Sequence, residues 1–478
     1  MKLNYLKFGT TALLWLFGTT LVSAQLLTDQ SAINLNDLSA FKDPGKTWSI
    51  AGAVTANPNV DNELKLIKGE GVLANISTKK VHGTDLYTNA PHGNIILELD
   101  YLMAKGSNSG IYLQGNYEIQ LTDSWGILNP FSSDNGGIYE RWDDAKPEGQ
   151  KGFGGYAPRQ NASKAPGLWQ HLKIAFQAPQ FDAAGNKIAN ARILTAELNG
   201  VLIHDNIELF GPTRGAANKE IALGPLRLQG DHGSVAFKNI KISKLPADQL
   251  EGSKRGGDSA DPIYIDAQAN TMIRSFVDFA PNQRSVHAIS VGSPQKVHYS
   301  YDLDNGLLLR GWHGEFVDAT PMWDGRGNGT SKARGVITSF AKKLIPAVAQ
   351  LSTPQAAWPV DSTGTGFRTK GYVIDNEDRP QFKYNSYGSQ ITDAITVLNN
   401  GKGLNRSIAI DKPVANLYVL LADASAVEEL VKGFYLIDGQ SYYLELDEAS
   451  DKPVIRDVDG RKQLIILLGN KLNYSISF

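Results

Sequence analysis

The chain has 478 residues, with 47 basic and 49 acidic side chains, 8 histidines and no cysteine. The near-neutral balance argues against a nucleic-acid partner, because phosphate binding needs a concentrated basic surface. Without cysteine the chain can form no disulfide, thiolate zinc site, iron–sulfur cluster or cysteine nucleophile. A chain of this length exceeds what one hydrophobic core supports, so two large domains are expected.

Residues 1–24 have the pattern of an export signal. Lys2 and Lys7 precede a short apolar stretch, Thr11–Val22, and small residues follow at the cleavage positions. The stretch is shorter than the roughly 20 apolar residues that a membrane-spanning helix needs. Because no cysteine follows the signal, a lipid anchor is excluded as well. We therefore expect a secreted protein without a membrane span, most simply in the periplasm of a Gram-negative bacterium.

Short segments with alternating apolar residues recur through the first half, separated by turns rich in Gly, Asn, Asp and Pro. No helical pattern alternates with them, which favours two packed sheets over a parallel α/β fold. The sequence therefore predicts an all-β first domain, a jelly-roll β-sandwich over residues 25–248. Its clearest strands are expected at 95–102, 110–114, 117–122, 171–176, 193–198 and 225–229.

A run of Pro, Gly and charged residues without apolar periodicity predicts a linker at 249–262. The remaining residues, 263–478, again show strand patterns and predict a second, β-rich sandwich-like domain. Strands are expected at 285–291, 297–303, 307–312, 371–374, 381–384, 414–421, 442–446 and 464–468.

Two helices are also expected in the second half. One covers 336–351 and is interrupted by Pro346. The other covers 426–433, where Ser425 and Glu428 have the spacing of a capping box.

The densest polar signal lies in Asn108–Ser124, over two adjacent strands. A period of two puts four apolar side chains on the core face, namely Ile111, Leu113, Ile119 and Leu121. The opposite face then carries Tyr112, Gln114, Glu118 and Gln120, with Asp123 just past the strand end. Hydrogen-bonding groups beside an aromatic ring suit a sugar. The alternative is a solvated outer face, which antiparallel sheets commonly have.

A second polar cluster follows from Leu226–Lys238. If Leu226 and Leu228 point inward, Arg227 and Gln229 share the polar face, and Asp231 and His232 occupy the next turn. An Asp-His pair beside a polar groove is a candidate for proton transfer, because histidine titrates near neutral pH. Two further loops carry side chains that would close such a groove, namely Glu140, Arg159 and Asn161.

Together these segments resemble the 3-keto-disaccharide hydrolase domain family. The matching stretches are NSGIYLQGNYEIQLTDS, GGIYE, NASKAPGLWQ, NGVLIHDN and GPLRLQGDHGSVAFKNIKISKL, in the order of the family and within about residues 39–245. The resemblance implies a concanavalin-like jelly roll and hydrolysis of glycosides oxidised at C3 of the glucose ring. One departure is Gln114, where many members carry arginine, so substrate choice here is expected to differ.

The implied chemistry begins with the acidity that a C3 ketone gives to the C2 proton. A base removes that proton, an enolate forms, and the aglycone leaves from C1, after which water adds back. Such a site needs a base, an oxyanion donor and an acid. We expect His232 or Glu118 as base, and Asp123 or Asp231 as acid or supporting group. The remaining polar side chains, namely Tyr112, Gln114, Gln120, Glu140, Arg159, Asn161, Arg227 and Gln229, are expected to bind the sugar.

No redox cofactor is required, because a separate sugar 3-dehydrogenase would oxidise the substrate beforehand. Whether a divalent cation polarises the ketone is open, since no recognised ligand spacing marks a metal site. Two alternatives to the keto-glycoside hydrolase remain. An ordinary glycosidase of the same fold needs two carboxylates about 5–10 Å apart, and a lectin-like module binds sugar without turnover.

The second half contains one comparable motif, Trp312–Asp318. It brings His313, Glu315 and Asp318 close together along the chain, with Trp323 nearby. This motif is either a second sugar or metal site, or a polar turn between packed strands. We expect the second domain to be accessory, contributing to substrate recognition or partner docking.

Overall fold

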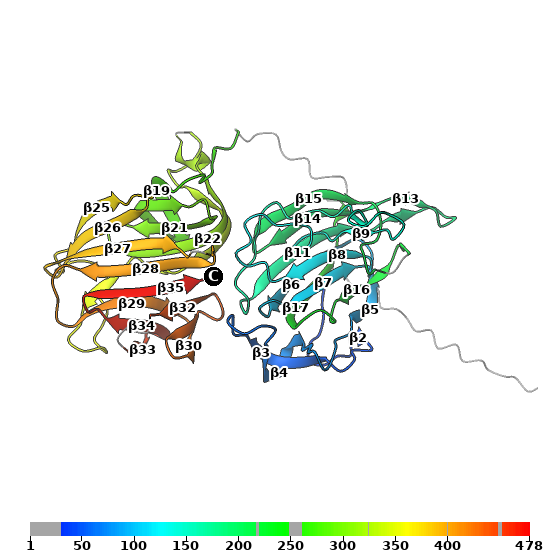
Figure 1. Cartoon of the computed structure of the whole chain (residues 1–478), viewed down its shortest axis with the longest axis horizontal. Coiled ribbons are helices and arrows are strands. Elements are labelled where there is room, and N and C mark those ends of the chain that lie inside the picture. The colour runs from blue at the N-terminus through cyan, green and yellow to red at the C-terminus, as the bar shows by residue number, and fades with distance from the viewer. Residues whose placement is uncertain (1–29, 217–218, 248–260, 324, 399, 448–451) are drawn as a thin grey trace, which may run out of the picture.

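The computed structural model describes residues 30–216, 219–247, 261–323, 325–398, 400–447 and 452–478 (Figure 1). The predicted signal, 1–24, and most of the predicted linker, 249–262, lie outside these residues. Two β-rich halves lie side by side, and the described strands of each half pair only within that half. Within the described residues, no helix is long and apolar enough to cross a membrane.

The N-terminal half is a sandwich of two antiparallel sheets. The larger sheet has the order β15 (Val201–Leu209), β14 (Ala191–Leu198), β11 (Gln170–Gln177), β6 (Ile95–Met103), β17 (Val235–Lys244), β4 (Lys65–Asn75) and β3 (Trp48–Thr55), with β1 (Gln30–Ala32) beside β17. The smaller sheet has the order β2 (Phe41–Lys42), β5 (Leu86–His92), β16 (Gly224–Leu228), β7 (Asn108–Leu113) and β8 (Tyr117–Thr122). Two short hairpins lie outside them, β9 (Arg141–Trp142) with β10 (Gly152–Phe153), and β12 (Gln180–Phe181) with β13 (Lys187–Ala189).

The core of this half fills the space between the two sheets. Leu97, Phe176 and Phe237 face it from the larger sheet, and Ile119 and Leu226 face it from the smaller one. Their strands alternate apolar and polar residues, so every second side chain is buried against the other sheet. The predicted all-β sandwich and the predicted inward-facing residues Ile111, Leu113, Leu121 and Leu228 are confirmed.

The C-terminal half contains three antiparallel sheets around a second core. The first sheet joins β18 (Tyr264–Ile265), β22 (Leu307–Asp318), β21 (Val297–Asp302), β20 (Gln283–Gly292) and β19 (Thr271–Ala280), with β23 (Lys332–Ser339) beside β22. The second joins β24 (Val348–Gln350), β29 (Leu417–Ala424), β34 (Arg461–Leu467) and β33 (Val454–Val458). The third joins β25 (Arg368–Ile374), β26 (Pro380–Ser386), β27 (Ser389–Val397), β28 (Gly403–Ile410), β35 (Lys471–Ser477), β32 (Tyr442–Leu446), β31 (Phe434–Ile437) and β30 (Val427–Val431).

Both predicted helices are wrong. Residues 336–351 form the end of β23, a loop and β24, and residues 427–431 form β30 at a sheet edge. The Ser425 hydroxyl donates to Asp438 at 2.6 Å instead of capping a helix. A short 3₁₀ helix, η1 (Thr320–Met322), lies between β22 and β23.

The two halves touch through apolar packing and hydrogen bonds. Apolar side chains from both halves form one cluster, namely Ala165, Leu168, Phe434, Leu436 and Tyr443, with Trp125 and Leu430 against it. The Trp125 indole N–H donates to the carbonyl of Phe478 at 2.9 Å, and the Tyr443 hydroxyl donates to the carbonyl of Pro166 at 3.0 Å. Figure 1 shows the C-terminus where the two halves meet.

Candidate functional site

The face of the smaller sheet that points away from the core carries polar and aromatic side chains in two rows. Strand register pairs Arg227 with both Tyr87 and Tyr112, and pairs Tyr112 with Glu118. These four residues therefore form one row across β5, β16, β7 and β8. Two residues away on each of these antiparallel strands, the same register gives a second row of Asp85, Gln229, Gly110 and Gln120.

The segment after β8 folds back and extends both rows. The Tyr139 N–H donates to the carbonyl of Glu118 at 3.1 Å, and the Gln120 N–H donates to the carbonyl of Gly137 at 2.8 Å. Because Ile138 pairs with Ile119 and faces the core, Tyr139 joins the first row and Gly137 joins the second.

Gly110 makes room for the carboxyl group of Glu118. A Cβ atom at position 110 would lie 2.2 Å from Oε1 of Glu118, so no larger residue fits there without moving that side chain. The Glu118 carboxyl group thus lies across the neighbouring strand, over the middle of the second row.

Burial changes the protonation of Glu118. The residue is only 2% exposed, and removal from water raises the pKa of its carboxyl group from 4.5 to about 8. The hydrogen bond from Tyr112 and the positive charge of Arg227 lower this pKa, but they are outweighed. The negative charges of Asp85 and Asp231 raise it further. Glu118 is therefore mostly protonated at neutral pH and can donate a proton.

Arg227 is held firmly beside this carboxyl group. Its Nε donates to Oδ2 of Asp85 at 2.7 Å, its Nη1 donates to the carbonyl of Gly215 at 2.8 Å, and its guanidinium lies 4.1 Å from the Tyr112 ring centroid. Asp85 also accepts the Gly230 N–H at 3.1 Å. These contacts hold the guanidinium in place, so Arg227 provides a fixed positive charge at this position and packs against the Tyr112 ring.

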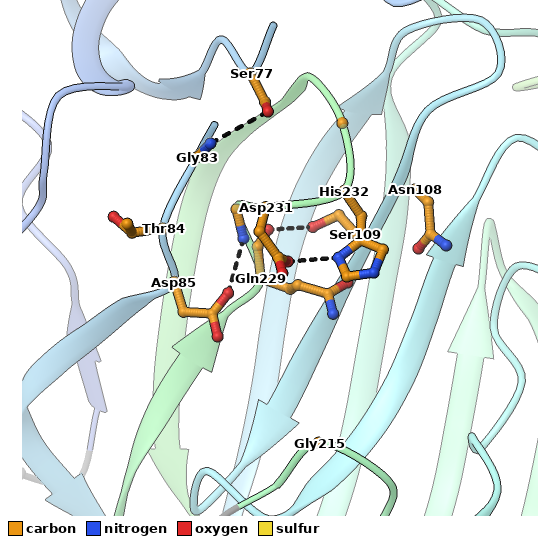
Figure 2. A network of polar contacts seen from close by, with 12 residues as sticks. Ser77, Gly83, Thr84, Asp85, Asn108, Ser109, Gly215, Gln229, Asp231 and His232 are labelled. Carbon is orange, nitrogen blue, oxygen red and sulfur yellow. Dashed lines mark hydrogen bonds and ion pairs between the residues drawn. The ribbon is translucent and has the colours of Figure 1, made fainter. Parts of the chain in front are cut away.

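An Asp-His pair lies at the end of β16 (Figure 2). Nδ1 of His232 lies 2.5 Å from Oδ1 of Asp231, and both side chains are about half exposed. With Asp231 ionised, Nδ1 carries the proton and Nε2 is the basic atom. In the view of Figure 2 the imidazole is drawn between the labelled side chains of Gln229 and Asn108. The pair is thus an accessible base beside a buried acid.

Close backbone packing fixes the loop that carries the pair. The Asn75 side-chain amide donates to the carbonyls of Gly230 at 2.8 Å and Gly233 at 2.9 Å. A Cβ atom on Gly233 would lie 2.2 Å from Oγ of Ser107, and one on Gly83 would lie 1.8 Å from the carbonyl oxygen of Gly230. The loop therefore fits only with glycine at these positions.

A second loop touches the first row. The Glu118 N–H donates to Oγ1 of Thr213 at 3.3 Å, and the carbonyl of Gly215 accepts Arg227. Thr213 in turn donates its N–H to the carbonyl of Asn116 at 2.9 Å. This loop connects the acid with the cation and helps to cover the row.

The structure brings seven of the twelve predicted site residues together on this face, namely Tyr112, Glu118, Gln120, Arg227, Gln229, Asp231 and His232. Tyr112, Glu118 and Gln120 are all buried, which a freely solvated sheet face would not produce. The Gln120 side-chain amide donates to Oδ1 of Asn108 at 3.1 Å, which fixes its orientation.

Two predicted residues next to β7 and β8 stabilise turns. Gln114 has φ of 53° in the turn after β7, and its side-chain amide donates to the carbonyls of His92 at 3.2 Å and Ala222 at 2.9 Å. Asp123 accepts the Gly106 N–H at 2.9 Å. These contacts are with backbone groups, so both side chains have clear structural partners.

The other three predicted residues lie off the two rows. The Glu140 carboxylate lies over Gly152 of β10. Arg159 pairs with Asp205 of β15 at 3.3 Å. The Asn161 side-chain amide donates to two carbonyls of the loop that follows β8, at 2.7 and 2.9 Å.

Sequence reasoning missed three side chains of the rows, Asp85, Tyr87 and Tyr139. Asp85 and Tyr87 flank Leu86, which is fully buried, so a period of two places both on the polar face. Tyr139 had no such signal, because it joins the sheet through single backbone contacts and not through a strand.

Among the described residues, no three His, Asp or Glu side chains gather in a way that could hold a metal ion. The motif around His313 lies on β22 and contacts the N-terminal half, because the Glu315 N–H donates to Oε1 of Gln160 at 3.0 Å. Trp312 is fully buried, and Nε2 of His313 lies 3.2 Å from the carbonyl oxygen of Gly401. Glu315 pairs with Lys296 at 3.1 Å. These contacts favour the packed-strand interpretation over a second site.

Solved structures match this chain at low sequence identity and with low TM-scores. A protein from Parabacteroides distasonis assigned as a glycosyl hydrolase has 22% identity and a TM-score of 0.33, and the match covers 46% of this chain and 84% of that one. A second one from the same organism has 20% identity and a TM-score of 0.29 over 45% and 100% of the two chains. The binding domain of botulinum neurotoxin serotype D has 9% identity and a TM-score of 0.24 over 94% and 97%.

No curated protein matches the chain. No family profile matches the C-terminal half. Residues 30–243 match the profile described as the 3-keto-alpha-glucoside-1,2-lyase-like domain, and this stretch contains both sheets of the sandwich and both polar rows. The N-terminal half of the chain is therefore a domain of that family.

Proposed function

We propose that the N-terminal domain cleaves glycosides whose glucose ring is oxidised at C3, by elimination across C1–C2 followed by addition of water. The observation that carries this proposal is the pairing of a buried, protonated carboxyl group, Glu118, with an accessible base, His232, on one polar face. The family to which the domain belongs supports the same chemistry by its description.

The first half-reaction is an elimination. His232 takes the proton from C2, whose electrons form the enolate with the C3 carbonyl, and the C1–O bond then breaks as Glu118 protonates the departing oxygen. In the second half-reaction, water adds its oxygen to C1 of the enone and a proton returns to C2. The sum is hydrolysis, with no net change in oxidation state.

Residues of the first row would stabilise the negative charge of the enolate. The enolate carries negative charge at the C3 oxygen, and Arg227 supplies a fixed positive charge beside Tyr112. Gln229 and Gln120 offer amide groups on the second row for sugar hydroxyls. Asp231 holds the His232 ring and stabilises its protonated form.

We also propose which reaction precedes this one, in which compartment it takes place, and what the C-terminal half does. A separate sugar 3-dehydrogenase would oxidise the glycoside, so this protein would need no redox cofactor. Export to the periplasm, as residues 1–24 predict, would place it where such glycosides arrive. The C-terminal half would serve as an accessory domain.

The test is release of 3-keto-glucose from 3-keto-trehalose and of glucose from plain trehalose, with and without EDTA. Cleavage of the oxidised sugar alone is expected, and the EDTA arm measures metal dependence. Cleavage of plain trehalose would indicate an ordinary glycosidase, and binding of either sugar without cleavage would indicate a lectin-like module.

A pH profile tests the two roles. With Glu118 as acid, kcat/KM should fall as pH rises through about 8, the pKa of its carboxyl group in the free protein. Glu118→Gln should remove this alkaline limb and lower kcat by about 100-fold or more, the usual contribution of general acid catalysis. A rate that rises through pH 8 would instead make Glu118 the base.

A further inference from the structure

The edge of the smaller sheet is completed by a segment that is not itself a strand. This return segment, residues 123–139, leaves the end of β8 and comes back beside it. The Gln120 N–H donates to the carbonyl of Gly137 at 2.8 Å, and the Tyr139 N–H donates to the carbonyl of Glu118 at 3.1 Å. The return segment therefore pairs with the two residues of β8 that carry the acid and an amide of the site.

The beginning of the return segment lies against the C-terminal half. The Trp125 indole N–H donates to the carbonyl of Phe478 at 2.9 Å, and Nζ of Lys402 lies 4.9 Å from the centroid of the indole ring. A Cβ atom on Gly126 would lie 2.9 Å from Cγ of Lys402 and 3.0 Å from the carbonyl oxygen of Asn400. The return segment therefore packs tightly against the loop before β28.

Buried hydrogen bonds connect this contact with the part of the return segment that pairs with β8. Oγ of Ser124, the residue before Trp125, accepts the Asn135 N–H at 3.0 Å and donates to Oδ1 of Asp134 at 3.0 Å. Ser124 and Asn135 are each 1% exposed. The Gly137 N–H donates to the carbonyl of Asp134 at 2.9 Å. A displacement at the contact is therefore transmitted through few hydrogen bonds to the backbone beside β8.

We propose that the C-terminal half holds the return segment in register with β8, and that Trp125 is the positioning residue through which it acts on Glu118 and Gln120. Trp125 lies at the interface of the two halves, so its effect on turnover is indirect. Proton transfer is sensitive to such placement, because a misplacement of about 1 Å can lower a rate by about 100-fold. This inference rests on the proposed function, and it gives the C-terminal half a role in turnover.

The first experiment measures kcat/KM of the full chain for 3-keto-trehalose as a function of pH. Trp125→Ala should lower kcat/KM by about 10-fold or more. It should also move the alkaline limb to lower pH, because burial raises the pKa of Glu118 and a displaced return segment admits water to that carboxyl group. The other groups that act on this pKa do not belong to the return segment, namely Tyr112, Arg227, Asp85 and Asp231.

Gln440→Ala is the matched control. The Gln440 side-chain amide also joins the two halves, but it donates to the carbonyl of Val54, on β3 of the larger sheet, at 2.8 Å. Its loss should leave kcat/KM within about 2-fold and the alkaline limb unmoved. Lys402→Ala weakens the contact from the C-terminal side, so it should change both quantities in the same direction as Trp125→Ala. It carries the test if Trp125→Ala does not fold.

The second experiment follows hydrogen–deuterium exchange and needs no activity. The N–H groups of Gln120 and Tyr139 are bonded between β8 and the return segment. Trp125→Ala and Lys402→Ala should speed their exchange by about 10-fold or more, because the return segment then opens more often. Gln440→Ala should leave it unchanged.

The outcomes separate this inference from the proposed function. Exchange that is unchanged in both interface variants would refute the inference, whether or not the protein is active. Faster exchange with unchanged kcat/KM and an unmoved alkaline limb would refute the positioning role while the proposed function stands. If the unaltered protein cleaves no keto-glycoside, the proposed function fails, and exchange alone decides: faster exchange supports the hold on the return segment, and unchanged exchange overturns it.

Discussion

Replacing Glu118 with glutamine should stabilise the N-terminal domain in a way that grows with pH. The folded state holds the Glu118 proton up to a pKa of about 8, whereas the unfolded chain releases it near 4.5. Between these values the folded state binds more protons than the unfolded state, so its stability falls as pH rises. Glutamine has nearly the same shape and stays neutral, so it avoids this loss.

The size of the effect follows from the difference in pKa. At about 1.4 kcal/mol per pH unit, the ionisable carboxyl costs about 3 kcal/mol of stability at pH 7 and about 5 kcal/mol once pH exceeds 8. Below pH 4.5 both proteins carry a neutral group at this position and should be nearly equal in stability. The difference is a large fraction of the roughly 5–15 kcal/mol that typically stabilise a domain.

The assay is urea unfolding of both proteins at several pH values from 4 to 9, followed by tryptophan fluorescence. Trp48 is buried in the core of the N-terminal half and reports on it. Glu140→Gln is the control, because it makes the same chemical change at a carboxylate that lies off the rows, over Gly152. A stability difference between Glu118→Gln and the unaltered protein that stays constant from pH 5 to 8 would refute the reasoning.

Three further substitutions test neighbouring contacts. Gly110→Ala places a Cβ atom 2.2 Å from Oε1 of Glu118, so turnover of 3-keto-trehalose should fall at least 10-fold while circular dichroism stays unchanged; normal turnover would contradict the described position of Glu118. Asp85→Asn weakens the hold on Arg227 and should shift the alkaline limb of the pH profile to lower pH, because a negative charge near Glu118 is lost; an unmoved limb would contradict this. Trp125→Ala removes a hydrogen bond across the interface and should lower the melting temperature measured by calorimetry; an unchanged value would show that the contact contributes little.

The strand pattern of the site was predictable because the two faces of β8 differ sharply in polarity. Ile119 and Leu121 face the core while Glu118 and Gln120 face the rows, so a period of two assigned these four side chains of β8 correctly. The predicted segment 117–122 matches β8 at both ends.

The two wrong helix predictions rested on local sequence patterns, whereas strand pairing determines the structure of both segments. The segment 426–433 alternates only weakly and contains good helix formers, but β31 offers it a sheet edge on which to pair. In 336–351, the β-branched pair Val336 and Ile337 favours the strand that the structure shows. The β30 segment forms a hairpin with β31 directly after it, whereas β23 and β24 pair with strands further away in the sequence, β22 and β29.

The membership of the site was predictable where a strand, or the turn directly after one as for Asp231 and His232, carried the residue. In the sequence, Gln114 continues the alternation of β7. In the structure, its backbone adopts a left-handed conformation, and its side chain turns away from the polar face and donates to the carbonyl of Ala222. Asp85 and Tyr139 enter the rows from separate segments that a single sequence does not bring together. Spacing along the chain places Asp85 on a polar face, but it does not show which segments lie side by side.

The charges around Glu118 explain why Arg227 does not prevent it from acting as an acid. A free guanidinium beside a carboxyl group would favour the ionised form and lower its pKa. Here Asp85 occupies Nε of Arg227 at 2.7 Å and adds its own negative charge, so burial dominates and Glu118 keeps its proton. The positive charge stays beside Tyr112, where an enolate would form, while the acid stays protonated for the leaving group. The arrangement costs stability at alkaline pH, and the same retained proton is what the proposed elimination uses.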